Sequence, residues 1–351
     1  MKVVHIITGL GGGGAEKFVF NICRELINKG YSQKVIVLND NQLDLLPLFT
    51  AAKIEVTPLN IRQQPFALIS KALHFARLLR QEKNAVLHAH MFHSLVFACL
   101  IKLFHPGIKI VFTSHNFNIG SRLREVITFL LKPFRSTDIL FSRKMHRKFY
   151  KDEANCRIIP NGIPTAEYDL NVKKEETYTF ICVARLEKVK NQKAILVAAN
   201  KLHKEGLPFK VWLVGQGDMS DELKQYAATN HLNDVIVFKG FSQEIPTLMN
   251  QANCFLLPSL WEGMPLSILE AAASGLPVVC TAVGSIPEFF SDELITYTAA
   301  DDLYPVMKKV LEASSLYAEK GQVLKQYVRE HFDIATTIQQ HLDVYKQLAK
   351  Y

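Results

Sequence analysis

The stretch GLGGGGAEKF, residues 9–18, comes directly after the apolar run Lys2–Thr8 and opens a helix-length amphipathic segment. A short run rich in β-branched residues, followed by glycines and then by a helical period, predicts a strand, a tight loop and a helix. These are the first elements of a βαβ unit. The opening of the chain therefore predicts a parallel sheet with helices on its faces.

The same alternation continues along the chain. In the first half we expect strands at Lys2–Thr8, Gln33–Leu38, Ala85–His90, Lys109–Ser114, Asp138–Ser142 and Cys156–Pro160. In the second half we expect them at Tyr178–Ala184, Phe209–Val214, Val235–Phe238, Cys254–Pro258, Val278–Ala282 and Leu294–Tyr297. The polar segment 161–177 separates the two groups and is expected to be a linker. The fold class is therefore α/β, with two Rossmann-like doubly wound domains and a ligand cleft between them.

The composition is typical of a soluble globular protein. A chain of 351 residues is too long for one ordinary domain and fits two. The six cysteines stand singly in apolar runs, which predicts reduced core thiols in a cytoplasmic protein. We expect no signal peptide, because the first apolar run is short and passes straight into glycines. We expect no transmembrane helix, because charges, a proline and a glycine interrupt the most apolar stretch, 94–112.

The net charge of +8 is unevenly distributed. Residues 1–165 carry 23 Lys and Arg against 10 Asp and Glu, whereas the remainder carries 18 against 23. A basic half beside an acidic half predicts that one domain faces an anionic partner.

The glycines of the opening stretch also fit a dinucleotide-binding pattern. Gly9, Gly11 and Gly14 satisfy G-x-G-x-x-G after an expected strand, and Asp40 follows the next apolar run. An NAD enzyme is therefore one alternative.

A second stretch has the composition of a phosphate site. VARLEKVKNQ, residues 183–192, places Arg185 and Lys190 between an expected strand and the helix that follows. A pyrophosphate there would meet a guanidinium, an ammonium and the positive end of a helix dipole. Two solvated loop cations are the other interpretation.

A third stretch, PSLWEGMPLSILEAAASGLPVV at residues 258–279, carries two carboxylates with seven residues between them. Glu262 lies in a Gly/Pro loop and Glu270 on the helix after it, so we expect them to serve different parts of one extended ligand rather than one metal. A carboxylate accepts hydrogen bonds from hydroxyls, which suits Glu270 to a ribose and Glu262 to a sugar. A surface position on the helix is the alternative for Glu270.

The order of these motifs resembles one family. The motifs are GGAE (13–16), HAH (88–90), TSH (113–115), IPNGI (159–163), R-x4-K (185–190), GQGD (215–218), E-x7-E (262–270) and ASGLPVV (273–279). Together they resemble the motifs of the retaining, nucleotide-sugar-dependent glycosyltransferases of family 4, the group 1 type. The resemblance covers nearly the whole chain. The resemblance implies the GT-B fold, in which two Rossmann-like domains face each other across a cleft. It also implies an acceptor-side domain at 1–165 plus 333–351 and a donor-binding domain at 166–332.

The resemblance gives the glycine loop a different role from NAD binding. Gly13 and Gly14 match the positions whose bare backbone approaches the donor, so the dinucleotide pattern is a coincidental match and Asp40 loses its role. Glu16, counted as the third residue of the next helix, is expected on the acceptor side and as a helix cap. His115 resembles the histidine that lies against the donor sugar. His90 is expected on the acceptor side of the same cleft, with a purely structural role as the alternative.

The resemblance also assigns the donor site. Arg185 and Lys190 look like the diphosphate clamp and Glu270 like the ribose acceptor, while Glu262 and the backbone of 263–266 would hold the sugar. The implied donor-binding set is Gly13, Gly14, Arg185, Lys190, Glu262, Gly263, Met264, Pro265, Leu266 and Glu270, and the implied catalytic set is Arg185, Lys190, His115 and Glu262. The chain departs from the common pattern at Met264, where an aromatic residue is frequent, and at Ser285, where glycine is frequent, and both changes bear on the shape of the donor pocket.

The implied reaction is transfer of a hexose from a nucleoside diphosphate, most simply UDP, to a hydroxyl of a glycan or lipid-linked acceptor with retained configuration. We expect no cofactor and no metal, because the chain has no D-x-D motif and two cations stand in the phosphate site. A GT-B epimerase or phosphorylase and a non-catalytic sugar-nucleotide-binding subunit remain as alternatives.

The segment Ser121–Lys151 is both basic and amphipathic. It combines Arg122, Arg124, Lys132, Arg135, Arg143, Lys144, Arg147, Lys148 and Lys151 with the apolar residues Val126, Ile127, Phe129, Leu130 and Leu131. Such a helix can lie on anionic lipid, which predicts a cytoplasmic enzyme with peripheral attachment to the inner face of the membrane. A core-packed helix with a solvated basic face is the alternative. We expect no nucleic-acid partner, because no aromatic-interleaved basic stripe or known module is present.

Overall fold

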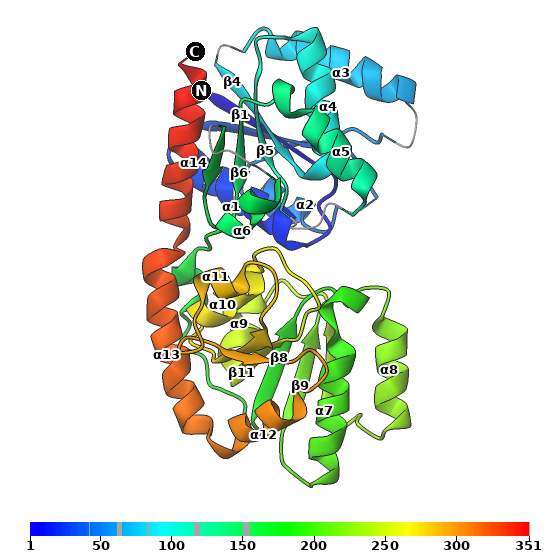
Figure 1. The fold of residues 1–351 in the computed structure, drawn as a ribbon, viewed down its shortest axis with the longest axis vertical. Helices are drawn as coiled ribbons and strands as arrows, with labels where there is room; N and C mark the ends of the chain where they lie inside the picture. The colour runs from blue at the N-terminus through cyan, green and yellow to red at the C-terminus, as the bar shows by residue number, and fades with distance from the viewer. Residues whose placement is uncertain (42, 62–64, 83, 116–119, 150–154, 351) are drawn as a thin grey trace. The chain divides into compact units, whose positions relative to one another are not determined.

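The computed structural model describes residues 1–350 except 42, 62–64, 83, 116–119 and 150–154. The chain forms two compact units, each built around its own sheet (Figure 1). The first unit is Met1–Gly162 with Ile334–Tyr351, and the second is Ile163–Asp333.

The first unit is a seven-stranded parallel sheet in the order β3-β2-β1-β4-β5-β6-β7. Its strands are β1 (Lys2–Ile7), β2 (Ser32–Val37), β3 (Glu55–Pro58), β4 (Ala85–His90), β5 (Lys109–Thr113), β6 (Thr137–Leu140) and β7 (Cys156–Ile158). Its helices are α1 (Gly14–Asn28), α2 (Leu46–Ala51), α3 (Pro65–Leu79), α4 (Met91–Phe104), α5 (Arg122–Leu130), η1 (Lys132–Phe134), α6 (Arg143–Phe149) and α14 (Ile334–Ala349).

The two faces of this sheet differ in chemistry. Because side chains alternate along a strand, Val4 and Ile6 point to one face and His5 to the other. The first face is apolar and packs against α3 and α4. The second face carries buried polar groups and packs against α1 and α14, where the Tyr345 hydroxyl lies 2.7 Å from Nδ1 of His88.

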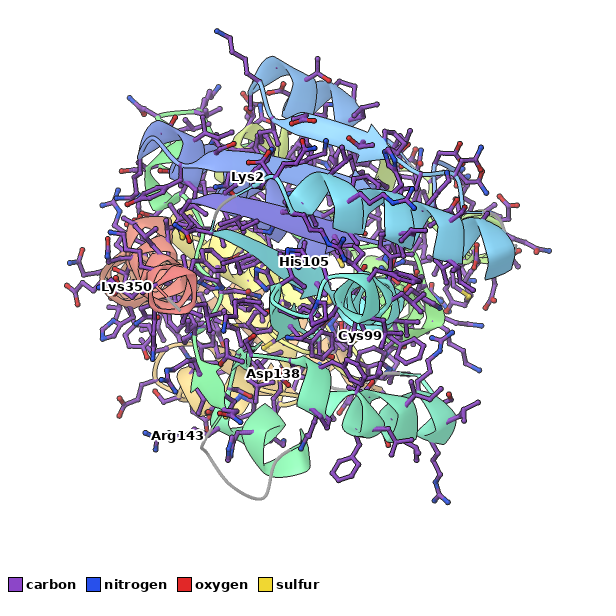
Figure 2. The ribbon with its side chains drawn as sticks, turned by 90° about the horizontal axis from the view of Figure 1, so that it is seen from above. Lys2, Cys99, His105, Asp138, Arg143 and Lys350 are labelled. Atoms are coloured by element: carbon purple, nitrogen blue, oxygen red, sulfur yellow. The ribbon has the colours of Figure 1, made fainter. Side chains whose placement is uncertain are left out.

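The last helix of the chain belongs to the first unit. Figure 2 shows α14 end-on beside the sheet, with Lys350 just beyond its end. Its inward face is fully buried at Ile338, His341 and Tyr345. The core of the first unit is therefore assembled from two segments that are far apart in sequence.

The second unit is a six-stranded parallel sheet in the order β10-β9-β8-β11-β12-β13. Its strands are β8 (Thr179–Val183), β9 (Lys210–Val214), β10 (Ile236–Gly240), β11 (Cys254–Leu257), β12 (Val278–Thr281) and β13 (Thr296–Thr298). Its helices are η2 (Thr165–Tyr168), η3 (Lys188–Lys190), α7 (Gln192–Lys204), α8 (Ser220–Thr229), α9 (Ile245–Gln251), α10 (Leu266–Ala273), α11 (Ile286–Phe289), α12 (Tyr304–Glu312) and α13 (Ser314–His331). The α/β class and the two doubly wound sheets are confirmed.

Two expectations need correction. The sequence did not reveal β3, a short strand that ends in Pro58 and, among the described strands, pairs with β2 at the edge of the sheet. The segment 161–177 is not a free linker, because it folds into the second unit soon after it begins. Ile163 bridges to Asp333, and Thr165 and Tyr168 are buried.

Candidate functional site

Each sheet has one point at which the order of its strands reverses. The reversal lies between β1 and β4 in the first unit and between β8 and β11 in the second. In open parallel sheets, ligands bind outside the carboxyl ends of the strands at such a point. The loops that follow these four strands contain most of the residues singled out from the sequence.

In the second unit, the reversal brings Lys190 and Glu262 together. Nζ of Lys190 lies 2.7 and 2.9 Å from the two carboxylate oxygens of Glu262, and the Ser259 hydroxyl donates to one of these oxygens at 2.6 Å. The side chain of Glu262 is 7% exposed and that of Lys190 is 20% exposed. A buried carboxylate needs such partners, because its desolvation is costly. An ammonium has three N–H donors, so this pair leaves Lys190 one donor for a ligand.

Arg185 lies at the same edge but is open to solvent. Its side chain is 61% exposed, and it forms an ion pair with Glu187 at 2.7 Å. An exposed pair of this kind is weak, so an anionic ligand can displace Glu187. The backbone at Arg185 is fixed by a hydrogen bond, because the Gln192 side chain donates to the Arg185 carbonyl at 2.8 Å. The two cations of the expected clamp thus have different surroundings.

The loop after Glu262 is fixed by close backbone contacts. Gly284 has a φ of +60°, and a Cβ there would lie 1.8 Å from the Glu262 carbonyl oxygen, so only glycine fits. The Ser285 hydroxyl donates to the Gly263 carbonyl. Met264 is buried, and α10 begins at Leu266 directly after Pro265. Ser285 thus fixes the shape of the loop that was expected to hold a donor sugar.

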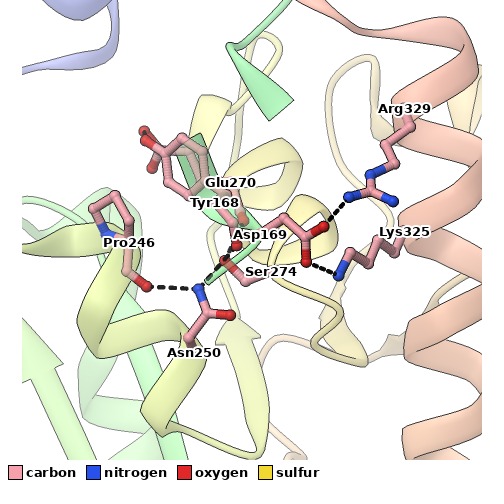
Figure 3. A network of polar contacts seen from close by, with 8 residues as sticks. All are labelled: Tyr168, Asp169, Pro246, Asn250, Glu270, Ser274, Lys325 and Arg329. Carbon is pink, nitrogen blue, oxygen red and sulfur yellow. Dashed lines mark hydrogen bonds and ion pairs between the residues drawn. The ribbon is translucent and has the colours of Figure 1, made fainter. Parts of the chain in front are cut away.

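Glu270 is buried inside the second unit rather than on a helix surface (Figure 3). Its Oε1 accepts a hydrogen bond from the Tyr168 hydroxyl at 2.8 Å. The carbonyl of Tyr168 accepts in turn from the Asn250 amide at 2.9 Å. The surface alternative is therefore wrong. The role of Glu270 toward a ribose stays a prediction.

In the first unit, the glycine loop leads directly into α1. Gly13 is the residue that caps the helix and Gly14 is its first residue. Glu16 is in the first turn, and a Cβ at Gly13 would lie 2.6 Å from Oε2 of Glu16. The carboxylate therefore folds back over the start of its own helix, as expected for a cap. The acceptor-side assignment of Glu16 stays a prediction.

Beside this loop lies a group of buried histidines. His90 is the last residue of β4, and His115 follows β5 in the left-handed region with a φ of +59°. Nδ1 of His90 lies 2.8 Å from Nε2 of His115, so the two expected histidines are in contact. His5, His88 and His341 of α14 also belong to the group and were not expected. The i, i+2 spacing of His88 and His90 on a buried strand was the available signal.

Burial keeps these rings neutral. Desolvation lowers the pKa of His5 to about 3, against an opposing hydrogen bond with Gln33, and lowers the pKa of His115 to about 3. It also lowers the pKa of His341 to about 4, and those of His88 and His90 well below their usual range.

Among the described residues, His5, His88 and His90 place their ligand atoms within 4.8 Å of one another, a spacing that fits a metal ion. Hydrogen bonds already occupy these atoms. Nδ1 of His5 and Nε2 of His90 are hydrogen-bonded at 3.0 Å. His88 is hydrogen-bonded to the Tyr345 hydroxyl at 2.7 Å and to the Thr113 hydroxyl at 2.9 Å. The group is thus satisfied by its own contacts, and the expectation that no metal is needed stays a prediction.

These features define an α/β protein with a candidate ligand-binding edge at each strand-order reversal. Two family models match the chain, Glycosyl transferases group 1 over residues 167–331 and Glycosyltransferase Family 4 over residues 12–167. Together they span residues 12–331, and the chain belongs to this family of GT-B glycosyltransferases.

The curated relatives include the UDP-Gal:alpha-D-GlcNAc-diphosphoundecaprenol alpha-1,3-galactosyltransferase of Escherichia coli. It is 28% identical over 59% of this chain and 60% of its own length, so the chain spans about three fifths of that relative. The gpi3 subunit of the Schizosaccharomyces pombe phosphatidylinositol N-acetylglucosaminyltransferase is 22% identical over 91% of this chain and 74% of its own length.

Among solved structures, Anabaena Alr3699/HepE in complex with UDP-glucose has a TM-score of 0.86. The match covers 99% of this chain and 100% of that one at 19% identity. A glycosyltransferase from Rickettsia africae has a TM-score of 0.83 at 17% identity and covers 99% and 98% of the two chains. The GT-B fold therefore extends over the whole chain.

The buried pair of Lys190 and Glu262 predicts that removing one partner destabilises the protein more than replacing both partners with apolar residues. Lys190→Ala should lower the free energy of unfolding by about 3–5 kcal/mol, because it leaves a buried carboxylate without its cation. The double variant Lys190→Met/Glu262→Leu should regain most of this loss. Urea unfolding can be followed by the fluorescence of Trp212 and Trp261, which are both in the second unit.

The matched control is Lys193→Ala, which removes an exposed pair with Glu222 at 2.8 Å and should cost less than about 0.5 kcal/mol. Equal losses in Lys190→Ala and Lys193→Ala would show that Glu262 does not depend on Lys190.

The neutral histidines predict that acid destabilises the first unit. Their folded pKa values lie below the unfolded value of about 6.5, so the unfolded chain binds more protons and stability falls as pH drops below about 6.5. At pH 5.5, His5, His115 and His341 together should cost about 4 kcal/mol, a large share of a typical domain stability of about 5–15 kcal/mol.

Hydrogen exchange measured by mass spectrometry between pH 7 and pH 5 can compare the two units. We expect protection to be lost first in 1–162 and 334–350, while tryptophan fluorescence still reports a folded second unit. Equal protection of the first unit at both ends of this pH range would contradict the neutral state of these rings.

Proposed function

We propose that this chain is a retaining glycosyltransferase that moves a hexose from a UDP-sugar to a hydroxyl of a glycan or lipid-linked acceptor, in the synthesis of a cell-surface polysaccharide or glycolipid. The observation that carries the proposal is the placement of Arg185, Lys190 and Glu262 at the strand-order reversal of the second unit. The relatives support the donor and the acceptor class, since the Escherichia coli protein is named for UDP-Gal and a diphosphoundecaprenol-linked sugar. The Anabaena structures contain UDP and UDP-glucose.

The proposed reaction depends on stabilising the negative charge that develops on the leaving group. When the bond between sugar and phosphate breaks, negative charge grows on the departing diphosphate. Arg185 can turn from Glu187 toward this charge, and Lys190 offers its remaining N–H while Glu262 holds the ammonium in place. Fixed cations at the point where charge develops stabilise the transition state more than the ground state. This arrangement does the work that a divalent metal does in other transferases, so we infer that turnover needs no metal.

Arg185 tests this assignment without the folding cost expected for Lys190. Arg185→Ala should lower kcat by about 10²- to 10³-fold with UDP-glucose or UDP-galactose as donor, as for the loss of one charge-stabilising donor. UDP release in the presence of EDTA is the measurement. The control is Lys188→Ala, an exposed lysine of the same loop, which should retain kcat.

UDP should stabilise the wild-type chain by about 2.7 kcal/mol at 100 times its Kd, and NAD should not. Near-normal turnover in Arg185→Ala, together with loss of activity in EDTA, would show that the clamp assignment is wrong. Stabilisation by NAD and not by UDP would reject the proposed donor.

The proposal includes attachment to a membrane surface through α5. Leu123, Val126, Phe129 and Leu130 are between 54% and 68% exposed, so the alternative of a core-packed helix does not hold for these side chains. No helix in the described part of the chain is long and apolar enough to span a bilayer. An exposed apolar helix face beside cations fits a site that lies on anionic lipid.

Not all of the basic residues around α5 are available to bind lipid. Arg122, Arg124, Arg143 and Lys144 are exposed. Arg135 is buried against Asp138 at 2.6 Å and is therefore not available to lipid, which corrects the expectation for that residue. Lys151 and the side chains of Arg147 and Lys148 lie outside the described residues.

Binding to vesicles tests this surface. The chain should cosediment with phosphatidylglycerol/phosphatidylcholine vesicles at low salt and be released at high salt, because the attraction is screened. Leu123→Ser/Phe129→Ser should weaken binding by at least about tenfold, since each buried side chain contributes about 1.5–3 kcal/mol. The control Leu316→Ser/Val323→Ser, two exposed apolar residues of α13, should bind like wild type. Equal binding to phosphatidylcholine alone would contradict the proposal.

A further inference from the structure

Four side chains form an unbroken row of hydrogen bonds across neighbouring strands of the first sheet. Oε1 of Gln33 on β2 lies 3.1 Å from Nε2 of His5 on β1. Nδ1 of His5 lies 3.0 Å from Nε2 of His90 on β4, and Nδ1 of His90 lies 2.8 Å from Nε2 of His115 after β5. We call Gln33, His5, His90 and His115 the histidine row.

The direction of this row is fixed at Gln33. Its amide nitrogen donates to the carbonyls of Ser32 at 2.9 Å and Tyr31 at 3.4 Å, so its oxygen must face His5. An amide oxygen only accepts hydrogen bonds, and Nε2 of His5 therefore carries the proton.

The same reasoning passes along the row. A neutral ring with a proton on Nε2 has a lone pair on Nδ1. Burial keeps His5 neutral, so its Nδ1 accepts and Nε2 of His90 must donate. His90 is neutral as well, so its Nδ1 accepts from Nε2 of His115. Each ring is thereby held in one tautomer by the ring before it.

The row ends where a ligand is expected. Gln33 is 5% exposed, His5 and His90 are fully buried, and His115 is 9% exposed at the carboxyl edge of the sheet. His115 has a φ of +59°, a backbone conformation that a residue other than glycine adopts at a cost and that is frequent at functional sites. The hydrogen bonds within the described residues leave Nδ1 of His115 as the terminal acceptor.

We propose that Gln33, His5 and His90 are positioning residues that fix His115 as the Nε2–H tautomer, so that its Nδ1 accepts a hydrogen bond from a hydroxyl of the donor sugar. This inference rests on the proposed function for the sugar, whereas the tautomer itself follows from the structure alone. The row makes the site selective for a group that donates, because a second acceptor opposite Nδ1 would be repelled. Polarisation along consecutive hydrogen bonds strengthens the terminal acceptor.

The first measurement needs no variant and no ligand. In protein labelled with 15N-histidine, two-bond 1H–15N correlation spectra distinguish the two neutral tautomers. We expect His5, His90 and His115 to be protonated on Nε2, with resonances assigned from the spectra of single His→Gln variants. A proton on Nδ1 of His115 overturns the proposal whatever the activity.

The second measurement separates positioning from structure. Gln33→Met removes the fixed acceptor at nearly constant volume, and Tyr345→Phe removes a comparable buried hydrogen bond, to His88, outside the row. Calorimetry would use UDP and the tightest-binding of UDP-glucose, UDP-galactose and UDP-N-acetylglucosamine. Gln33→Met should weaken binding of the UDP-sugar about tenfold, or about 1.4 kcal/mol, and leave that of UDP unchanged. Tyr345→Phe should change neither.

Other outcomes are equally decisive. Equal weakening of UDP and UDP-sugar, or an equal effect of the two variants, would reject positioning and leave a structural role. One equivalent of a metal bound by these histidines in the purified protein would overturn the row, because the ion would replace its hydrogen bonds. If the wild type binds no UDP-sugar, the proposed function fails, and the tautomer spectra still decide the state of His115.

Discussion

Both sheets reverse their strand order between two central strands, and this constraint places the candidate ligand groups. In the first unit the reversal sets the glycine loop after β1 next to the end of β4, where His90 lies. In the second unit it sets the loop of Arg185 and Lys190 next to the loop of Glu262. Parallel strands share one carboxyl edge, so loops far apart in sequence meet there without any long excursion of the chain. The chemistry of each edge is then decided by a few side chains.

Most of the polar groups at these edges are buried and held by specific partners, whereas Arg185 is exposed. Glu262 is held by Lys190 and Ser259, Glu270 by Tyr168, and His115 by His90. Leaving a buried polar group unpaired is more costly than any one of these contacts is favourable. The partners therefore restrict the buried site groups in the absence of a ligand, while Arg185 remains free to turn toward one.

The sequence predicted the part of this arrangement that depends on pattern. Alternating strand and helix periods located every strand except β3, whose four residues end in a proline at an edge and show no clear period. Motif order located Arg185, Lys190, Glu262 and Glu270. It could not show that Lys190 and Glu262 form a pair, because that contact depends on how two loops 72 residues apart meet.

The histidine group shows a second limit. His90 and His115 stood out because they lie at strand ends in recognisable motifs. His5 lies inside β1 among apolar neighbours, and Gln33 lies between Ser32 and Lys34 at the start of β2. Their relation to His90 follows from the register of three strands, and a single sequence does not contain that register. The segment 161–177 was predicted to be a linker, and this prediction was wrong for a related reason. It is polar in composition, yet a few buried residues such as Tyr168 are enough to fold it onto the second unit.

The discontinuity of the first unit has a consequence for its synthesis. The second unit is one continuous segment, 163–333, whereas the first unit needs α14 to cover the face of its sheet that carries His5 and His88. At about 5–20 residues per second, a ribosome takes roughly 10–40 s to pass from the end of β7 to the end of α14. During that interval the nascent first unit exposes a histidine-lined surface, and the second unit can fold before it. The first unit can therefore complete its fold only after the whole of the second unit has been synthesised.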